Sequence, residues 1–148
     1  MGHRNPLGLA FDESGQLWNI EMGPRHGDEL NMVERAKNYG YPIVSNGDHY
    51  ETQSIPDHPL SSRTAVAIRD YGLEISDHGL NPEFDMPSAY WVPAISPSSL
   101  MFYSGSEFPE WNGDAFIGGL SGQAVIRVEF DGAAAQEAQR LEVDGRRI

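Results

Sequence analysis

The stretch LGLAF at Leu7–Phe11, followed by DESG at residues 12–15 and QLWNIEM at Gln16–Met22, decides the fold class. Large apolar side chains alternate with small ones in the first run, and the second run is rich in Leu, Trp and Ile. Short apolar runs separated by Asp, Ser and Gly are typical of strands and turns rather than helices. We therefore predict a β-hairpin at this point of the chain.

The rest of the chain continues this pattern of short apolar runs bounded by Gly, Pro, Asn and Asp. The further strands that we predict span residues 28–33, 65–68, 99–103, 114–118, 124–130 and 140–143. Residues 45–89 are rich in Pro, His, Asp and Ser, so we interpret them as a long excursion that holds only the strand at 65–68. The one helix-friendly stretch, Ala133–Ala138, is too short to form a stable helix by itself. The fold class that we predict is all-β.

One pattern occurs twice. Proline precedes Leu and Phe with the same spacing in PLGLAF at Pro6–Phe11 and in PSSLMF at Pro97–Phe102, an offset of 97 − 6 = 91 residues. Blades of β-propellers repeat at roughly 40–50 residues. The offset therefore fits either two blades or one blade plus the long excursion.

The composition limits the classes of partner. The chain of 148 residues carries 10 Lys and Arg against 22 Asp and Glu, a formal net charge of −12. Such a surface repels nucleic acid and anionic lipid, and suits neutral substrates and divalent cations. The chain has no Cys, which excludes disulfides and thiolate metal sites, and no run approaching the roughly 20 apolar residues of a membrane span.

The sequence around Gly23-Pro24 supplies both main-chain carbonyls and carboxylates. Proline kinks the chain there and removes an amide donor, and Asp28-Glu29 follow closely. Carbonyl and carboxylate oxygens suit a hard cation such as Ca²⁺. An ordinary turn remains the alternative, because no D-x-[DN]-x-[DN]-G loop is present.

Arg4-Asn5 offer a planar cation and an amide, which suit a flat anionic ligand, although a turn with a solvated Arg explains the same pair. Common catalytic motifs are missing from the sequence: it has no G-x-S-x-G elbow and no P-loop. No zinc-site spacing occurs among the five histidines, which are His3, His26, His49, His58 and His78.

Three longer motifs occur in order along the chain: HRNPLGL at residues 3–9, EMGPRHGDELN at 21–31 and KNYGYP at 37–42. They are followed by WVP at 91–93 and FPEWNGD at 108–114. From residue 2 to the end, this series resembles the aldose sugar dehydrogenase branch of the pyrroloquinoline quinone (PQQ)-dependent glucose/sorbosone dehydrogenases. The resemblance implies a six-bladed β-propeller, of which residues 1–148 form a partial domain of about three blades.

The resemblance also implies site residues. Arg4 and Asn5 match the pair that contacts the quinone. The carbonyls of Gly23 and Pro24 match those that hold the Ca²⁺ of the cofactor. These implied roles agree with the chemistry suggested by the residues themselves.

Further positions follow in the same way. Glu29, with the carbonyl of Tyr39, matches a second calcium site of structural character. Tyr50 and Arg147 match positions that contact the cofactor. Gln123 lies in a turn where the family often has Lys, so one cationic contact is lost or replaced by an amide, and we expect weaker affinity for the quinone.

The reaction implied is oxidation of an aldose at its anomeric carbon, with hydride transfer to PQQ and electrons passed to an external acceptor. The family resemblance also implies a periplasmic or secreted protein. The general-base histidine of the family lies in an earlier blade, and none of the five histidines here takes its role, so we expect this chain alone to be inactive. A partial propeller exposes sheet faces on which further blades would pack, so we expect self-association. Two alternatives stay open: a non-catalytic calcium-binding propeller module and a calcium-dependent propeller lactonase, which the HRNP series disfavours.

Overall fold

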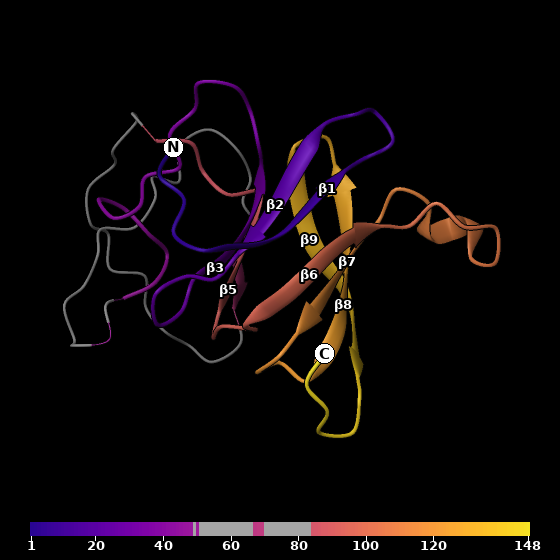
Figure 1. Ribbon diagram of the computed structural model, residues 1–148. Helices are drawn as coiled ribbons and strands as arrows, with labels where there is room; N and C mark the ends of the chain where they lie inside the picture. The colour runs from indigo at the N-terminus through magenta and orange to yellow at the C-terminus, as the bar shows by residue number, and fades with distance from the viewer. Residues whose placement is uncertain (49, 51–66, 70–83) are drawn as a thin grey trace.

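A computed structural model describes residues 1–48, 50, 67–69 and 84–148 of the chain. These residues form two β-sheets that pack face to face (Figure 1). Helix within the described residues is limited to one 3-10 turn, η1 at Pro109–Trp111. The predicted all-β class is therefore confirmed.

The first sheet has five strands in the order β1-β2-β3-β5-β4. Its strands are β1 (Pro6–Phe11), β2 (Leu17–Glu21), β3 (Asp28–Met32), β4 (Ala67–Arg69) and β5 (Ala89–Val92). Neighbours pair antiparallel except β4, which runs parallel to β5. The predicted hairpin at the start of the chain is thus confirmed as β1 and β2, and residues 33–88 separate β3 from its partner β5.

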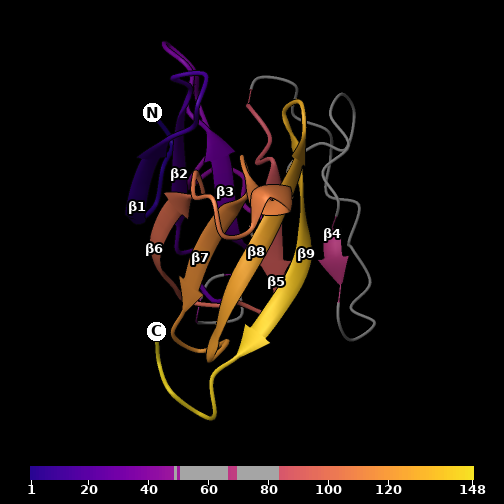
Figure 2. The same ribbon diagram turned by 90° about the vertical axis from the view of Figure 1, so that its right-hand side faces the viewer.

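The second sheet is a meander of four consecutive antiparallel strands (Figure 2). Its strands are β6 (Pro97–Phe102), β7 (Ala115–Gly119), β8 (Ala124–Asp131) and β9 (Ala134–Glu142). Each strand pairs with the next one along the chain, so local turns alone set the order. This sheet needs no long connection.

The core lies between the two sheets. Trp18, Ile20 and Leu30 from the first sheet contribute to the same buried cluster as Ile117 and Ile126 from the second. Aromatic edges close one side of this cluster, with the Trp18 and Phe130 ring centroids 4.8 Å apart. Burial of this apolar surface is the main force that holds the sheets together.

The repeated Pro-x-x-Leu-x-Phe pattern marks equivalent strands. Both β1 and β6 begin with the pattern, and each has a register shift directly after its proline, before Gly8 and before Ser99. The two strands also approach closely, because a Cβ at Gly8 would lie 2.6 Å from the Leu100 amide nitrogen. Among the described residues, the offset of 91 therefore corresponds to one sheet plus the long excursion, and not to two sheets.

One strand was not predicted and one predicted strand begins too late. Strand β5 begins at Ala89, the last residue of the stretch interpreted as an excursion, and was missed because its partner β3 is distant in the sequence. Strand β9 begins at Ala134 rather than Arg140, because the helix-friendly Ala133–Ala138 stretch pairs with β8 from Asp131 back to Val128. Pairing with neighbouring strands overrides local propensity in both places. The predicted strand at 65–68 is β4 at 67–69, and residues 65 and 66 lie outside the described residues.

Candidate functional site

The antiparallel order places most of the predicted site residues at one end of the two sheets. Successive connections alternate between the two ends of an antiparallel sheet. We call the site end the group of segments at residues 3–5, 22–27, 93–96, 120–123 and 143–148, and the far end the connections at 12–16, 103–114 and 132–133. The predicted residues at the site end are Arg4, Asn5, Gly23, Pro24, Gln123 and Arg147.

Arg4 and Asn5 lie directly against the turn that follows β2. The Arg4 guanidinium donates a hydrogen bond to the Met22 carbonyl at 3.1 Å, and the Met22 amide donates to the Asn5 carbonyl at 3.0 Å. The Arg4 guanidinium carbon also lies 6.0 Å from the ring centroid of Tyr41. The Arg4 cation is thus held at Met22, the residue that precedes the predicted Ca²⁺-binding carbonyls of Gly23 and Pro24.

The Gly23-Pro24 turn is buried and tightly closed. A side chain at Gly23 would collide with the carbonyl oxygens of His26 and Gly27, so only glycine fits. Within the described part of the chain, no hydrogen-bond donor reaches the carbonyl oxygens of Gly23 or Pro24. Two carbonyl oxygens without donors suit a hard cation, so these residues fit the Ca²⁺ that the sequence predicts.

The outer face of the β2–β3 hairpin is polar although it is buried. Asn19 pairs with Asn31 across the strands, and Glu21 pairs with Glu29. Burial, and then the neighbouring Glu21 carboxylate, raise the pKa of Glu29 well above its ordinary value of 4.5. The Oδ1 atoms of Asn19 and Asn31 lack a hydrogen-bond partner in the described structure.

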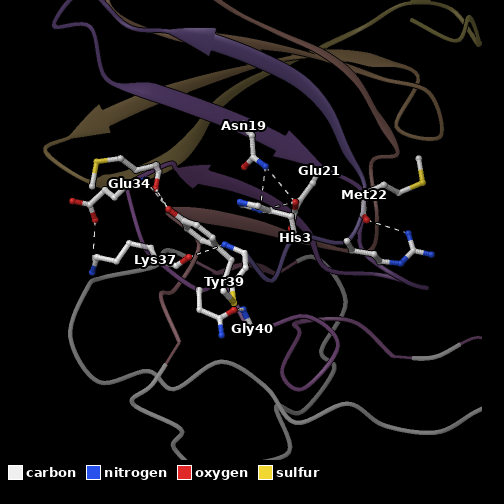
Figure 3. A network of polar contacts seen from close by, with 12 residues as sticks. His3, Asn19, Glu21, Met22, Glu34, Lys37, Tyr39 and Gly40 are labelled. Carbon is white, nitrogen blue, oxygen red and sulfur yellow. Dashed lines mark hydrogen bonds and ion pairs between the residues drawn. The ribbon is translucent and has the colours of Figure 1, made fainter.

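Tyr39 packs on this polar face through His3 (Figure 3). The two rings stack with centroids 4.3 Å apart, and His3 Nδ1 lies 3.0 Å from a Glu21 carboxylate oxygen. The Tyr39 hydroxyl donates to the Met32 carbonyl at 2.7 Å and accepts from the Glu34 amide at 2.8 Å. Tyr39 is therefore fixed beside the sheet that carries Glu29.

The second calcium site stays a prediction, and this arrangement shows which oxygen atoms it would use. Glu29 supplies a buried carboxylate, and two amide oxygens on the same face lack partners. In the residues that the structure describes, no group of three or more His, Cys, Asp or Glu side chains is arranged to hold a metal. A cation here would therefore depend on amide and main-chain oxygens as well as on Glu29.

The other three predicted cofactor contacts, Tyr50, Gln123 and Arg147, make no described contact with Arg4. The Tyr50 side chain is 69% exposed, and Gln123 and Arg147 are exposed at the site end. The Gln123 carbonyl accepts a hydrogen bond from the Val143 amide at 3.1 Å, which ties its turn to the end of β9. No hydrogen bond or ion pair in the described ranges connects Tyr50, Gln123 or Arg147 with Arg4.

Two histidines, His3 and His26, fall within the described residues, and His49, His58 and His78 lie outside them. His3 Nδ1 faces Glu21, whereas His26 lies in the loop that follows Pro24. That neither histidine acts as the general base stays a prediction.

The sequence pointed to Asp28 only as a carboxylate near the Gly23-Pro24 turn, and its hydrogen bonds to two loops were not predicted. Its carboxylate accepts hydrogen bonds from the amides of Gly23, Ile95 and Ser96 at 2.7–2.9 Å, and its side chain is fully buried. Burial raises the pKa of this carboxyl, and the three amide hydrogen bonds offset part of the rise. Its position at the start of a strand, five residues after a buried glycine turn, was the available signal.

Comparison with known proteins places this geometry in a family. The sequence profile of the glucose/sorbosone dehydrogenases matches residues 1–148. The chain belongs to this family. Aldose sugar dehydrogenase YliI of Escherichia coli is 35% identical to it over 149 residues, which cover 99% of the chain and 35% of that relative.

Solved structures of family members share the fold. A crystal structure of glucose dehydrogenase superposes with a TM-score of 0.75 at 36% identity, covering 97% of this chain and 36% of the other. The PQQ-bound aldose sugar dehydrogenase from Streptomyces coelicolor gives a TM-score of 0.62 at 25% identity, covering 99% and 33%. The chain thus spans about a third of the length of these relatives. Among the described residues, no helix has the length and apolar character needed to cross a membrane.

Proposed function

We propose that the chain forms part of the cofactor and calcium site of a PQQ-dependent aldose dehydrogenase. The observation that carries this proposal is that the Arg4 guanidinium donates to the Met22 carbonyl, directly before Gly23 and Pro24, whose own carbonyls no described donor reaches. The PQQ-bound structure of a family member supports the choice of quinone. Calcium is proposed from the chemistry of the oxygen donors.

The bound quinone would accept a hydride from the anomeric carbon of the sugar and pass the electrons to an external acceptor. Arg4 would hold the anionic cofactor in place through its planar guanidinium. The Gly23 and Pro24 carbonyls would hold the Ca²⁺ at a defined point beside Arg4. Asn5, Tyr50, Gln123 and Arg147 complete the proposed set of cofactor contacts.

This chain is proposed to lack the complete catalytic set, since its histidines do not match the family's general base. We expect the purified 148-residue chain to bind the cofactor without oxidising sugar. Robust aldose oxidation by this chain would contradict the proposal.

The architecture proposed for the whole protein is a six-bladed propeller in the periplasm or outside the cell, with this chain as a partial domain. Leu7, Leu9 and Phe11 are exposed along one face of β1. Apolar side chains exposed in a row mark surfaces that pack against another body. We therefore expect self-association, and size-exclusion chromatography that shows a compact monomer would contradict this part of the proposal.

Calorimetric titration of PQQ into the chain, with Ca²⁺ and with a chelator, tests the proposal. Binding that requires Ca²⁺ is the expected result, and Arg4→Ala should weaken it. Arg35→Ala is the matched control, because Arg35 is an exposed cation outside the site end. Absence of PQQ binding, together with lactone hydrolysis in calcium buffer, would favour the lactonase alternative.

A further inference from the structure

Asp28 joins the turn that follows β2 to the loop that connects the first sheet with the second. One carboxylate oxygen accepts a hydrogen bond from the Gly23 amide at 2.9 Å, inside the turn that carries the proposed Ca²⁺-binding carbonyls. The other accepts from the amides of Ile95 and Ser96 at 2.8 and 2.7 Å, in the loop that precedes β6. A single buried side chain therefore connects the turn of the first sheet to the entry of the second.

The loop before β6 in turn holds the β7–β8 turn. The Ile95 carbonyl accepts hydrogen bonds from the amides of Ser121 and Gly122, both at 3.1 Å, and the Ser96 carbonyl accepts from the Leu120 amide at 2.9 Å. The Ser121 hydroxyl lies 2.8 Å from the Ser96 hydroxyl. This β7–β8 turn leads directly into Gln123, one of the proposed quinone contacts.

The geometry points to Asp28 as a positioning residue that couples Ca²⁺ binding at Gly23 and Pro24 to quinone binding at the turn of Gln123. This inference rests on the proposed function. Ca²⁺ that fixes the Gly23 turn would, through Asp28 and the loop before β6, also fix the turn that meets the quinone. The two ligands would then bind more tightly together than singly, and by thermodynamic linkage each would strengthen binding of the other by the same factor.

Aspartate suits this position because its ionised carboxylate only accepts hydrogen bonds, and three amide donors surround it. Asparagine has almost the same shape, but one of its two terminal atoms is a nitrogen that donates. That nitrogen would face at least one backbone N–H that now donates to Asp28, so the hydrogen bond would be lost. Asp28→Asn therefore removes a connection between the loops while it changes the packing little.

The far end provides a matched control. Asp12 also accepts hydrogen bonds from backbone amides, those of Ser14 at 2.9 Å and Gln16 at 3.0 Å, and from the Trp18 indole at 2.9 Å. It lies in the turn between β1 and β2, away from the site end. Asp12→Asn should weaken hydrogen bonds of the same kind without affecting the site.

The first measurement is the affinity for PQQ with Ca²⁺ and with a chelator, in the wild-type chain and in both variants. We expect Ca²⁺ to strengthen PQQ binding by about tenfold or more in the wild type. Asp28→Asn should lose most of this gain, and Asp12→Asn should retain it. If Asp28 served fold stability alone, Asp28→Asn would keep the calcium gain as Asp12→Asn does.

Amide hydrogen exchange supplies a measurement that needs no ligand. Asp28→Asn should speed exchange at Gly23, Ile95 and Ser96 and, through the shared loop, at Ser121 and Gly122. If Asp28→Asn fails to fold, Ser121→Ala tests the same connection from the second sheet, because it removes the hydroxyl contacts to Ala94 and Ser96. That variant should lose part of the calcium gain.

The outcomes separate the two proposals. PQQ binding that is absent in the wild type overturns the proposed function and this inference with it. Wild-type binding that gains from Ca²⁺, with the same gain in Asp28→Asn, overturns the inference alone. Exchange that rises at Gly23 in Asp28→Asn but stays unchanged at Ser121 and Gly122 also overturns it.

Discussion

The two faces of the β2–β3 hairpin are both buried, yet they have opposite chemistry. The inner face presents Trp18, Ile20 and Leu30 to the second sheet. The outer face presents Glu21 and Glu29 instead, with Asn19 and Asn31 beside them. Neighbouring positions along the same two strands therefore serve different purposes.

Burial of the inner face stabilises the fold, whereas burial of the carboxylates on the outer face does not. Apolar burial contributes about 25 cal/mol for each Å² removed from water, whereas two adjacent buried carboxylates cost free energy unless they are paired or protonated. The polar face covered by His3 and Tyr39 therefore contributes little to the stability of the fold. It is consistent with an oxygen-rich cation site, as proposed for Glu29.

The largest effect is expected on the inner face. Ile20→Ala removes a fully buried side chain and leaves a cavity between the sheets, so it should lower the free energy of unfolding by about 2–5 kcal/mol. Urea denaturation measures this loss. Ile43→Ala, at a residue that is 58% exposed and lies outside the exposed row of β1, is the control and should change stability by less than about 0.5 kcal/mol. A similar loss in both variants would contradict the assignment of the inner face as the core.

On the outer face, the effect depends on pH. The pKa of Glu29 is raised in the folded chain, so folding retains a proton that the unfolded chain releases above about pH 4.5. In chelator, the free energy of unfolding should therefore fall as pH rises above this value, by at most about 1.4 kcal/mol for each pH unit, until the folded-state pKa is passed.

Glu29→Gln should remove this part of the pH dependence, because the amide does not titrate. Chemical denaturation at a series of pH values measures it. The exposed Glu13→Gln variant should keep the wild-type profile. Identical profiles for Glu29→Gln and wild type would show that Glu29 does not hold its proton on this face.

A smaller effect is expected at the residue that covers the outer face. Tyr39→Phe leaves the Met32 carbonyl and the Glu34 amide without the hydroxyl that serves both, which should cost about 1–3 kcal/mol. Tyr50→Phe, at an exposed side chain, should cost almost nothing. Thermal melts of the two variants compare them directly, and equal melting temperatures would exclude a structural role for the Tyr39 hydroxyl.

The smallest effect is expected at the edge of this cover. Lys37 Nζ lies 2.9 Å from an Asp85 carboxylate oxygen, but both side chains are partly exposed. A double-mutant cycle with Lys37→Ala and Asp85→Ala should give a coupling of about 0.2–1 kcal/mol. The coupling should shrink in about 1 M salt because screening is then strong. A larger, salt-insensitive coupling would mean that the pair is buried in solution.

Much of the site end could be predicted because its residues follow strand ends. Arg4, Gly23 and Gln123 lie beside apolar runs that the sequence marks clearly, and antiparallel pairing brings such connections to one end. Local patterns therefore sufficed for their placement. Their roles rest on the family motifs.

The remainder depends on contacts that no local pattern encodes. The AYWV run of β5 is strand because it pairs with β3, and the Ala-rich start of β9 is strand because β8 lies beside it. Asp28 is important because Ile95 and Ser96 reach it from the other sheet. Each of these features depends on residues distant in the sequence or on a neighbouring strand.

The different connections of the two sheets have a consequence for folding kinetics. All pairs in the second sheet join consecutive strands, whereas β3 must find β5 across residues 33–88. Local contacts form faster than distant ones because less chain entropy is lost before they form. We therefore expect β6–β9 to fold first and to act as a template on which the first sheet closes. Closure entropy rises by only about 0.6 kcal/mol for each doubling of a loop, so the separation of β3 from β5 along the sequence should affect the rate of folding more than the stability of the folded chain.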